Sequence, residues 1–454
     1  MSDSPSLVER IAKWAHALNL DAVPDDAQRV AKRCIVDLVG VSIAGASRAQ
    51  SRRIADYASQ VHTPGPSTVF GSPARLSPVG AALVNGTVGH VLDFDDTSYT
   101  GIMHGSTVVF PSALAAAESA GADGRRLLEA FVAGSEVAYA VAVLCGHGHY
   151  HKGWWSTATF GTIGAAAAAS RALELSERQT ADALSLASLQ SGAQKAAFGT
   201  DAKPYLAGQA AAAGVESALL ASAGVSAPRS ALEGTNGFIQ VLNDGVLDYE
   251  GIERLGTQWR LVDPGIFFKQ YPVCSAAHAA TEVTRRLMDK HGLQCDSIQQ
   301  VVCEVPPLVA SSLLYDIPAN LQEAQFSMPF AVGTILARGR LGVENLTEDG
   351  LSDPFVQSGM SKVEMRRIDA LQHTEAPEGA RVSLMTDEGA EIADYLGIPT
   401  GMPSNPMSDE QLHEKFLSCT AAGGLEPGRA TALLKYLTNI ETGPVPVFTF
   451  SPTG

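Results

Sequence analysis

Residues 88–118 read VGHVLDFDDTSYTGIMHGSTVVFPSALAAAE, an acidic loop that leads into an apolar, Ala-rich segment. The loop brings three carboxylates, a hydroxyl and an imidazole close together in sequence: Asp93, Asp95, Asp96, Thr97 and His104. Because alanine is the strongest helix former, we expect a buried helix to begin after Pro111. Acid–base side chains in a loop directly before a rigid helix are typical of a pocket that transfers protons.

The composition indicates a large, helix-rich protein with more than one hydrophobic core. The chain has 454 residues, of which 45% are hydrophobic and only 18% charged, so two or three domains are expected. Its formal net charge of -16 argues against nucleic acids and membranes as partners, because both depend on basic surfaces. An anionic substrate would therefore need cations placed within its own pocket.

The cysteines and the N-terminus predict a reduced, cytoplasmic, soluble protein. Six cysteines are scattered without a CxxC pair or a zinc-like spacing. The first residues, MSDSPSLVERIAKWAHAL, show no secretory signal. They instead predict a helix with a capping box at Ser6 and Glu9 and one apolar face formed by Leu7, Ile11, Trp14 and Leu18. Polar residues and glycine interrupt the Ala-rich runs too often for a membrane span.

The first part of the chain, residues 1–263, is dominated by helix formers. Clear helical runs are expected at 165–175, 181–191 and 207–221. Two prolines and a glycine break this pattern at 261–272 (LVDPGIFFKQYP), where we place a domain boundary.

The second part, residues 264–399, mixes strands with a helix expected at about 324–337. Alternating residues around 301–305, 362–366 and 382–384 indicate strands, the last of which enters a hairpin turn at Thr386–Gly389. A Pro/Gly/Ser-rich stretch follows, and helices return within residues 400–454. We therefore predict a mostly α fold, in which both chain ends form an all-helical domain and an α+β domain is inserted between them.

The acidic loop allows three interpretations. It could be a solvated loop that caps a helix, or a proton-transfer site in which a carboxylate orients His104 and makes it more basic. It could also hold Mg²⁺ or another metal between Asp93, Asp96 and His104, although no phosphate-binding loop or second carboxylate cluster accompanies it.

A second polar segment, residues 147–170, begins with alternating histidines (His147, His149 and His151). We interpret them as a surface loop rather than a metal site. Ser156, Thr157 and Thr159 then precede an Ala/Gly-rich helix, where exposed amides and hydroxyls would suit a carboxylate or phosphate.

Two lysines stand beside prolines and apolar residues, Lys203 in DAKPYL and Lys269 in IFFKQYP. A surface position is the ordinary interpretation of a lysine, but a lysine in a pocket can bind a substrate carboxylate or act as a base. His278 lies on an Ala-rich helix and could equally be a core residue. Cys274 is interpreted as packing, because no partner pattern of a nucleophile accompanies it.

Several of these segments resemble the MmgE/PrpD family, which includes 2-methylcitrate dehydratases, cis-aconitate decarboxylases and an iminodisuccinate epimerase. The similar motifs are LDFDDT with HGSTVVFPSALAAAE, TATFGTIGAAAA, the KP of Lys203, the KxYP of Lys269 and the following His278, and they run in order from CIVDLVGVSIAG to NPMSDEQLHEKF. The resemblance implies a helical domain with an inserted α+β lid, an active site in the cleft between them, a homodimer, and no metal or other cofactor.

The sequence departs from the family pattern at three positions. Trp155 and Leu206 stand where the family usually has histidines, and Phe330 stands where a tyrosine is common. Two candidate proton donors are thereby lost unless His151 takes the place of one imidazole. Trp155 would also narrow the pocket.

The resulting hypothesis is a cofactor-independent lyase that acts on a di- or tricarboxylate. Lys203, Lys269 and hydroxyls near Thr97 and Thr157 would bind the substrate, and His104 steered by Asp93 would remove a proton next to a carboxylate. A 2-methylcitrate-dehydratase-like reaction is the first choice. The alternatives are epimerisation of an iminodisuccinate-like compound, decarboxylation of the cis-aconitate type, and a non-catalytic, ligand-binding homologue.

Overall fold

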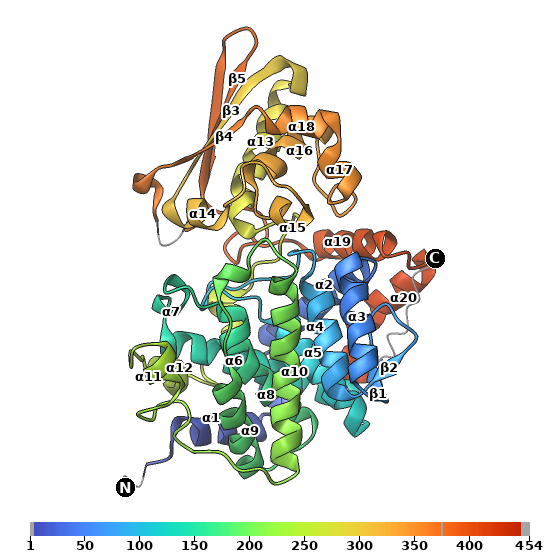
Figure 1. Cartoon of the computed structure of the whole chain (residues 1–454), viewed down its shortest axis with the longest axis vertical. Coiled ribbons are helices and arrows are strands. Elements are labelled where there is room, and N and C mark those ends of the chain that lie inside the picture. The colour runs from blue at the N-terminus through green and yellow to red at the C-terminus, as the bar shows by residue number, and fades with distance from the viewer. Residues whose placement is uncertain (1–3, 374–375, 446–454) are drawn as a thin grey trace.

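The computed structural model describes residues 4–373 and 376–445 and shows a mostly helical protein, as predicted. Figure 1 shows a larger helical part below and a smaller, sheet-bearing part above it. Each part has its own hydrophobic core. The larger core draws on residues from Leu7 to Phe268 and again from Met407 to Ile440, so both chain ends contribute to it. That the smaller part is a separate lid with boundaries at 264 and 399 stays a prediction.

The larger part is built mainly from long helices that pack against one another. They are α1 (Leu7–Ala17), α2 (Asp25–Ala46), α3 (Ala49–Val61), α4 (Pro78–His90), α5 (Ser106–Ala120), α6 (Gly124–Cys145), α8 (Ser156–Ala172), α9 (Glu177–Gln190), α10 (Ala202–Ser222), α19 (Asp409–Ala422) and α20 (Pro427–Leu437). Short elements complete it: β1 (Pro64–Thr68), β2 (Arg75–Leu76), α7 (Gly148–His151), α11 (Phe238–Leu242) and α12 (Glu250–Glu253). The capping box of Ser6 and Glu9 on α1 is confirmed.

Small residues let these helices approach closely. A Cβ atom added at Gly134 of α6 would lie 2.6 Å from the carbonyl oxygen of Gly164 in α8, and the reverse holds for Gly164. By length and composition, α6 alone among the described helices could cross a membrane, but 94% of its most apolar window is buried within the fold. It is therefore the core helix of this part.

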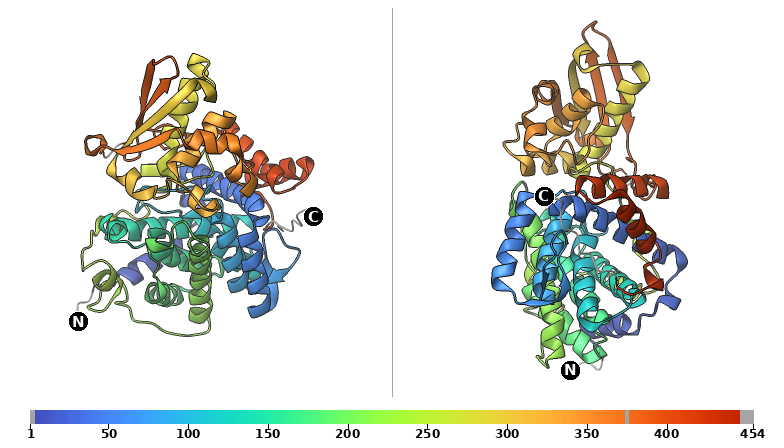
Figure 2. Two further views of the ribbon diagram at one scale, coloured as in Figure 1. Left: turned by 45° about the horizontal axis from the view of Figure 1, so that its top comes forward. Right: turned by 90° about the vertical axis from the view of Figure 1, so that its right-hand side faces the viewer.

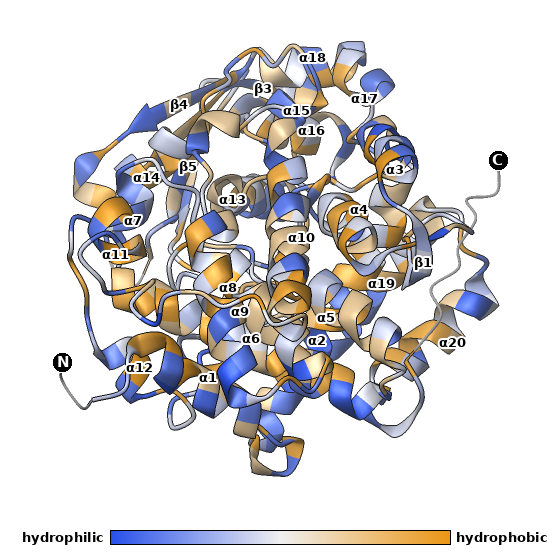
Figure 3. Ribbon diagram, turned by 60° about the horizontal axis from the view of Figure 1, so that its bottom comes forward, coloured by the Kyte–Doolittle hydropathy of each residue, from blue (hydrophilic) through white to orange (hydrophobic). Residues whose placement is uncertain are grey.

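The smaller part combines a four-stranded sheet with helices. Its elements are α13 (His278–His291), β3 (Ile298–Val305), α14 (Pro307–Ser312), α15 (Leu321–Ala324), α16 (Met328–Arg338), α17 (Glu348–Ser352), α18 (Pro354–Met360), β4 (Val363–Arg367), β5 (Ala380–Thr386) and β6 (Glu391–Leu396). The strand order is β4-β3-β5-β6, with β4 parallel to β3 and the other pairs antiparallel. The predicted strands and hairpin are thus confirmed. Edge strand β4 is mostly exposed and hydrophilic, drawn blue in Figure 3.

Three predicted helix limits were wrong. Helix α5 begins at Ser106, not after Pro111, because proline lacks only one intrahelical hydrogen bond and the fully buried residues around it stabilise the helix. The helix predicted at about 324–337 begins later, at Met328, where the hydroxyl of Ser327 caps α16, and Ala324 is instead the last residue of α15. The C-terminal helices end at Leu437, and residues 446–454, also predicted to be helical, lie outside the described residues.

The chain crosses between the two parts twice, and both crossings lie beside the acidic loop. In the outgoing segment (residues 261–272), Phe267 exchanges two backbone hydrogen bonds with Thr97, of 2.8 and 3.0 Å. The amide of Phe268 donates to the carbonyl of Gly401 in the returning segment (3.0 Å). Both views of Figure 2 keep the sheet-bearing part on one side of the helical part, with α19 along their boundary. The loop therefore lies where the two parts meet.

Candidate active site

The carboxylate of Asp93 is the centre of a buried cluster of charged groups. Asp93 directly follows α4 in a left-handed backbone conformation (φ +47°), which aspartate tolerates better than most residues. Its two carboxylate oxygens accept hydrogen bonds from two lysines that are distant in sequence. Lys203, in the first turn of α10, donates to Oδ1, and Lys269, in the outgoing segment, donates to Oδ2 (3.0 Å) and to the Asp93 carbonyl (2.6 Å). All three residues are at most 4% exposed.

The charges of this cluster stabilise one another. Burial alone would raise the pKa of Asp93, but the ammonium groups of Lys203 and Lys269 outweigh it and hold that pKa well below its usual range. Burial would likewise lower the pKa of Lys269, and Asp93 reverses the effect and raises it. At neutral pH the centre therefore consists of one carboxylate held between two ammonium groups.

Two imidazoles share the carboxylate of Asp95. The Nδ1 atom of His90 lies 2.9 Å from both Asp95 oxygens, and Nδ1 of His104 lies 3.3 Å from Oδ2 of Asp95 and 2.9 Å from the carbonyl oxygen of Asp96. Because these oxygens only accept hydrogen bonds, each Nδ1 must carry a proton. The Nε2 atom of a neutral His104 is then a free base, 3.8 Å from Oδ1 of Asp93.

The two imidazoles differ in exposure. Burial lowers the pKa of His90 to about 4, so His90 is neutral at physiological pH. The His104 side chain is 13% exposed, compared with 6% or less for its charged neighbours Asp93, Asp95, Lys203 and Lys269. His104 is thus the member of the cluster best placed to exchange a proton with a substrate.

Asp96 is not part of this group. Its carboxylate accepts from the Ser106 hydroxyl on the other side of the loop, and burial together with Asp37 raises its pKa to about 7. The predicted metal set of Asp93, Asp96 and His104 is therefore not brought together. Among the described residues, the set with metal-like proximity is His90, Asp93, Asp95 and His104, whose ligand atoms lie within 4.8 Å. Two ammonium groups on Asp93 make that set better suited to an anion than to a cation.

The predicted hydroxyl groups hold the loop in place. The Thr157 hydroxyl accepts from the His104 amide (3.0 Å), and the Thr97 hydroxyl donates to the Met103 carbonyl (3.2 Å). Ser156, Thr157 and Thr159 are fully buried, so the expectation of exposed hydroxyls at this helix start was wrong. Substrate contacts by Thr97 and Thr157 stay predictions.

Aromatic rings cover Lys203. Its Nζ atom lies 5.6 Å from the ring of Trp155, 5.1 Å from that of Phe198 and 4.9 Å from that of Phe326. The Trp155 ring also lies 5.4 Å from His90 and is fully buried. Trp155 therefore forms a wall of the cluster, and that it narrows the substrate pocket stays a prediction. Phe326 belongs to the smaller part of the protein and closes the cluster from that side.

The remaining predicted residues lie elsewhere. His278 is fully buried, with its ring 5.4 Å from that of Phe267, and burial lowers its pKa to about 3, which favours the interpretation as a core residue. Phe330 is fully buried in the core of the smaller part. His151 is exposed on α7. His149 corrects the predicted loop of surface histidines, because it is fully buried and bonds to the Thr159 hydroxyl (2.9 Å).

Sequence reasoning missed His90 and the orienting role of Asp95. His90 lies three residues before Asp93, on the helix that leads into the acidic loop, and this position was the available signal. Its partner could not be read from spacing, because the left-handed turn at Asp93 decides which carboxylate meets which imidazole.

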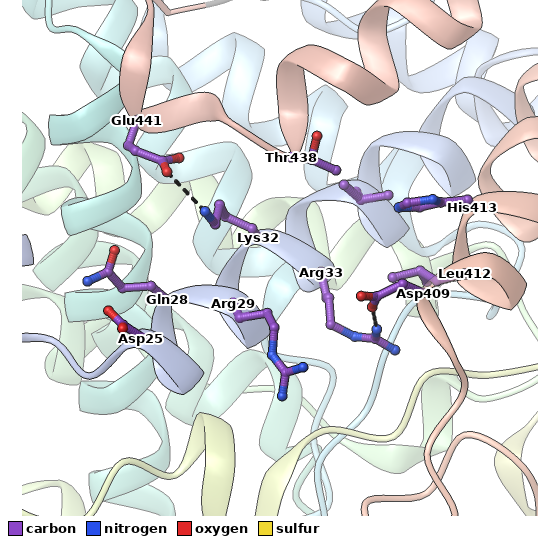
Figure 4. Close-up of a pocket in the computed structure, with 11 residues that line it drawn as sticks. Asp25, Gln28, Arg29, Lys32, Arg33, Asp409, Leu412, His413, Thr438 and Glu441 are labelled. Atoms are coloured by element: carbon purple, nitrogen blue, oxygen red, sulfur yellow. Dashed lines mark hydrogen bonds and ion pairs between the residues drawn. The ribbon is translucent and has the colours of Figure 1, made fainter.

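A surface cavity of about 480 Å³ lies apart from the cluster, between α2, α19 and α20 (Figure 4). It contains several cations, but two of them are already paired, Lys32 with Glu441 (3.0 Å) and Arg33 with Asp409. Its acids and bases are balanced, and it contains none of the predicted site residues. We therefore place the candidate active site at Asp93.

Comparisons with known proteins agree with this architecture. The MmgE/PrpD N-terminal domain matches residues 9–249, and the MmgE/PrpD C-terminal domain matches residues 271–435. The chain belongs to the MmgE/PrpD family. Lys269 falls between the two matched regions, and the first region contains Asp93, His104 and Lys203.

Relatives over nearly the full length are cis-aconitate decarboxylases. The human enzyme is 29% identical over 450 residues, which cover 96% of this chain and 92% of the relative. The enzyme of Aspergillus terreus is 24% identical over 438 residues, covering 90% of this chain and 88% of the relative. Decarboxylases are lyases, and these MmgE/PrpD relatives support an enzyme with a lyase-type function.

Proposed function

We propose that this MmgE/PrpD protein is a cofactor-independent decarboxylase of a small di- or tricarboxylate of the cis-aconitate kind. The observation that carries the proposal is the pair of ammonium groups on Asp93 beside one partly exposed imidazole, His104. The decarboxylase activity of the relatives supports the same reaction class. A cytoplasmic location and a homodimer are proposed from the sequence and the family resemblance.

The proposed reaction consists of loss of CO₂ followed by protonation of a substrate carbon. The bond between a substrate carbon and its carboxylate breaks, CO₂ leaves, and the electron pair moves onto that carbon and into the adjoining unsaturated system. Lys203, whose remaining N–H groups are not used by Asp93, stabilises the negative charge that develops there. His104, protonated at Nε2, then donates a proton to the carbon, and solvent restores that proton.

The number of proton transfers that each reaction requires favours decarboxylation over the dehydration first expected from the sequence. Decarboxylation needs one proton donated to carbon, whereas dehydration needs a base for the C–H proton and an acid for the departing hydroxide. Within the described cluster, His104 is the one imidazole that combines exposure with the required orientation, since His90 is buried and neutral. Trp155 and Phe330 supply no second acid.

The test is incubation in D₂O with cis-aconitate, 2-methylcitrate, citrate and iminodisuccinate, followed by proton NMR and CO₂ measurement. We expect CO₂ release with one deuterium per product molecule, and His104→Ala should lower kcat by about 10²–10⁴-fold. His291→Ala, at the exposed end of α13, is the matched control and should leave kcat unchanged. New vinyl signals without CO₂ would establish dehydration, and deuterium wash-in with inversion would establish epimerisation; either result overturns the proposal.

A further inference from the structure

The two lysines and two carboxylates of the Asp93 cluster balance one another, and protonated His104 adds only one positive charge, so a substrate with two or three carboxylates needs a further cation. Lys203 and Lys269 face the ionised carboxylates of Asp93 and Asp95, and His90 is neutral. A substrate with two or three carboxylates would bring excess negative charge into this site. The protein as a whole has a net charge of -16 and offers no general attraction for an anion.

Lys195 lies on a segment that borders the cluster. Its backbone amide donates to the carbonyl of Gly153 (2.9 Å), and the amide of Trp155 donates to the carbonyl of Ala193 (2.9 Å). Residues 193–195 therefore run beside residues 153–155. Because Trp155 is itself a wall of the cluster, this pairing places Lys195 at the edge of the site.

The Lys195 ammonium is half-buried and rests on an aromatic ring. Its Nζ atom lies 3.8 Å from the centre of the Tyr150 ring, a cation–π contact. Within residues 4–373 and 376–445, no carboxylate forms an ion pair with it, unlike Lys203 and Lys269. A cation held in this way has N–H groups available for an anionic ligand.

Electrostatic effects on neighbouring groups agree with this position. Burial lowers the pKa of Lys195, and Cys274, five residues after Lys269, acts in the opposite direction. Burial raises the pKa of Tyr150, and Cys274, Glu378 and Asp93 add to that effect. Tyr150 is therefore within electrostatic reach of the Asp93 carboxylate on one side and in contact with Lys195 on the other.

We infer that Lys195 binds a carboxylate of the substrate other than the one that is lost, and so selects substrates with a distal carboxyl group. This inference rests on the proposed function, because it assumes a polycarboxylate at the Asp93 cluster. Lys195 acts as a binding and specificity residue, while proton transfer stays with His104.

The test is calorimetric titration of the full-length protein with tricarballylate, a tricarboxylate without a double bond or hydroxyl group. We expect Lys195→Gln to weaken binding at least tenfold and Lys195→Arg to keep most of it, because the charge is retained. Lys152→Gln is the matched control. Lys152 follows α7 on the neighbouring loop and pairs with Asp244 at the surface, and its replacement changes the net charge equally, so this variant should change binding less than twofold.

The outcomes separate the two claims. If the wild-type protein binds tricarballylate and Lys195→Gln binds it equally well, the inference is overturned and the proposed function stands. Equal weakening by Lys195→Gln and Lys152→Gln would also overturn it, because long-range charge would then explain the effect. If the wild type releases CO₂ from its substrate but does not bind tricarballylate at millimolar concentration, the inference is overturned and the proposed function stands. Unchanged melting temperatures of the variants exclude unfolding as the cause of weaker binding.

Discussion

The two sides of the acidic loop hold aspartates whose pKa values are shifted in opposite directions. On one side, Asp93 meets two ammonium groups, and its pKa lies well below the usual range. On the other side, Asp37 and Asp96 are buried near a single ammonium group, that of Lys415, and the pKa of Asp96 is raised to about 7. Asp93 and Asp96 are only three residues apart and equally buried. The ratio of cations to carboxylates, not burial, therefore decides which carboxyl group carries charge.

Both sides are connected through the backbone of the loop. Lys415, on α19, pairs with Asp37 (2.7 Å) and also donates to the carbonyl of Phe94, between Asp93 and Asp95 (2.8 Å). The helix that returns from the smaller part thus supports the loop from behind, while Lys203 and Lys269 hold it from the front. Removal of a cation should therefore change stability and turnover by different amounts on the two sides.

The largest effect on stability and turnover is expected from Lys269→Met, on the Asp93 side of the loop. The variant leaves Asp93 buried with one ammonium group instead of two, and its carbonyl without a donor. We expect the free energy of unfolding to fall by roughly 3–5 kcal/mol and turnover to fall by about 10²–10³-fold. Urea denaturation and turnover of the substrate found by NMR would measure both effects.

A double variant tests the pairing within this cluster. Asp93→Asn with Lys269→Met leaves the buried Lys203 ammonium without its carboxylate, so neither stability nor activity should return. Lys290→Met, at an exposed position of α13, is the control for loss of a lysine. A Lys269→Met protein with wild-type stability would contradict the view that Asp93 needs both ammonium groups.

A smaller effect on stability and turnover is expected from Lys415→Met, on the side of the loop that holds Asp37 and Asp96. Asp37 already has a raised pKa, so it can take up a proton when its ammonium partner is lost. We expect the free energy of unfolding to fall by about 2 kcal/mol and turnover to fall about tenfold, because the Phe94 carbonyl loses its donor. Adding Asp37→Asn should restore stability. A Lys415→Met variant as impaired as Lys269→Met would remove the distinction between the two sides.

The sequence predicted the members of the front side better than their arrangement. Asp93, His104, Lys203 and Lys269 each lie in a short motif of unusual composition, and the structure brings all four together. Their contacts could not be predicted, because Lys203 lies 110 residues and Lys269 lies 176 residues from Asp93. His90 and Lys415 lie within quoted segments but were not singled out there, and the roles of His90, Lys195 and Lys415 depend on burial and on neighbours supplied by tertiary packing.

For the fold as well, local features could be predicted from the sequence and long-range contacts could not. The mostly helical character and the hairpin followed from residue types and spacing, since these are local properties. The start of α5 could not be predicted in this way. Proline is unfavourable inside a helix, but burial of the whole segment outweighs this preference at Pro111. Long-range packing thus accounts for this error as it does for the partners of Asp93.

The most direct test of the ionisation states is the pH dependence of stability in Asp96→Asn, a variant for which no loss of turnover is predicted. The pKa of Asp96 is about 7 in the folded protein and 3.8 for the unperturbed side chain. Between these values the unfolded chain releases a proton that the folded protein keeps, so this group's contribution to stability is complete below pH 3.8 and is lost as the pH rises to 7. Asparagine cannot ionise and escapes this loss.

The difference in unfolding free energy between Asp96→Asn and wild type should therefore rise in favour of the variant, by roughly 2–4 kcal/mol between pH 4 and pH 8. Urea denaturation across this range measures it, and the contributions of groups that do not interact with Asp96 cancel in the difference. Asp316→Asn, at an exposed position, should show no such slope. A flat difference for Asp96→Asn would mean that Asp96 is ionised like Asp93, and that cation number does not set the charge of this loop.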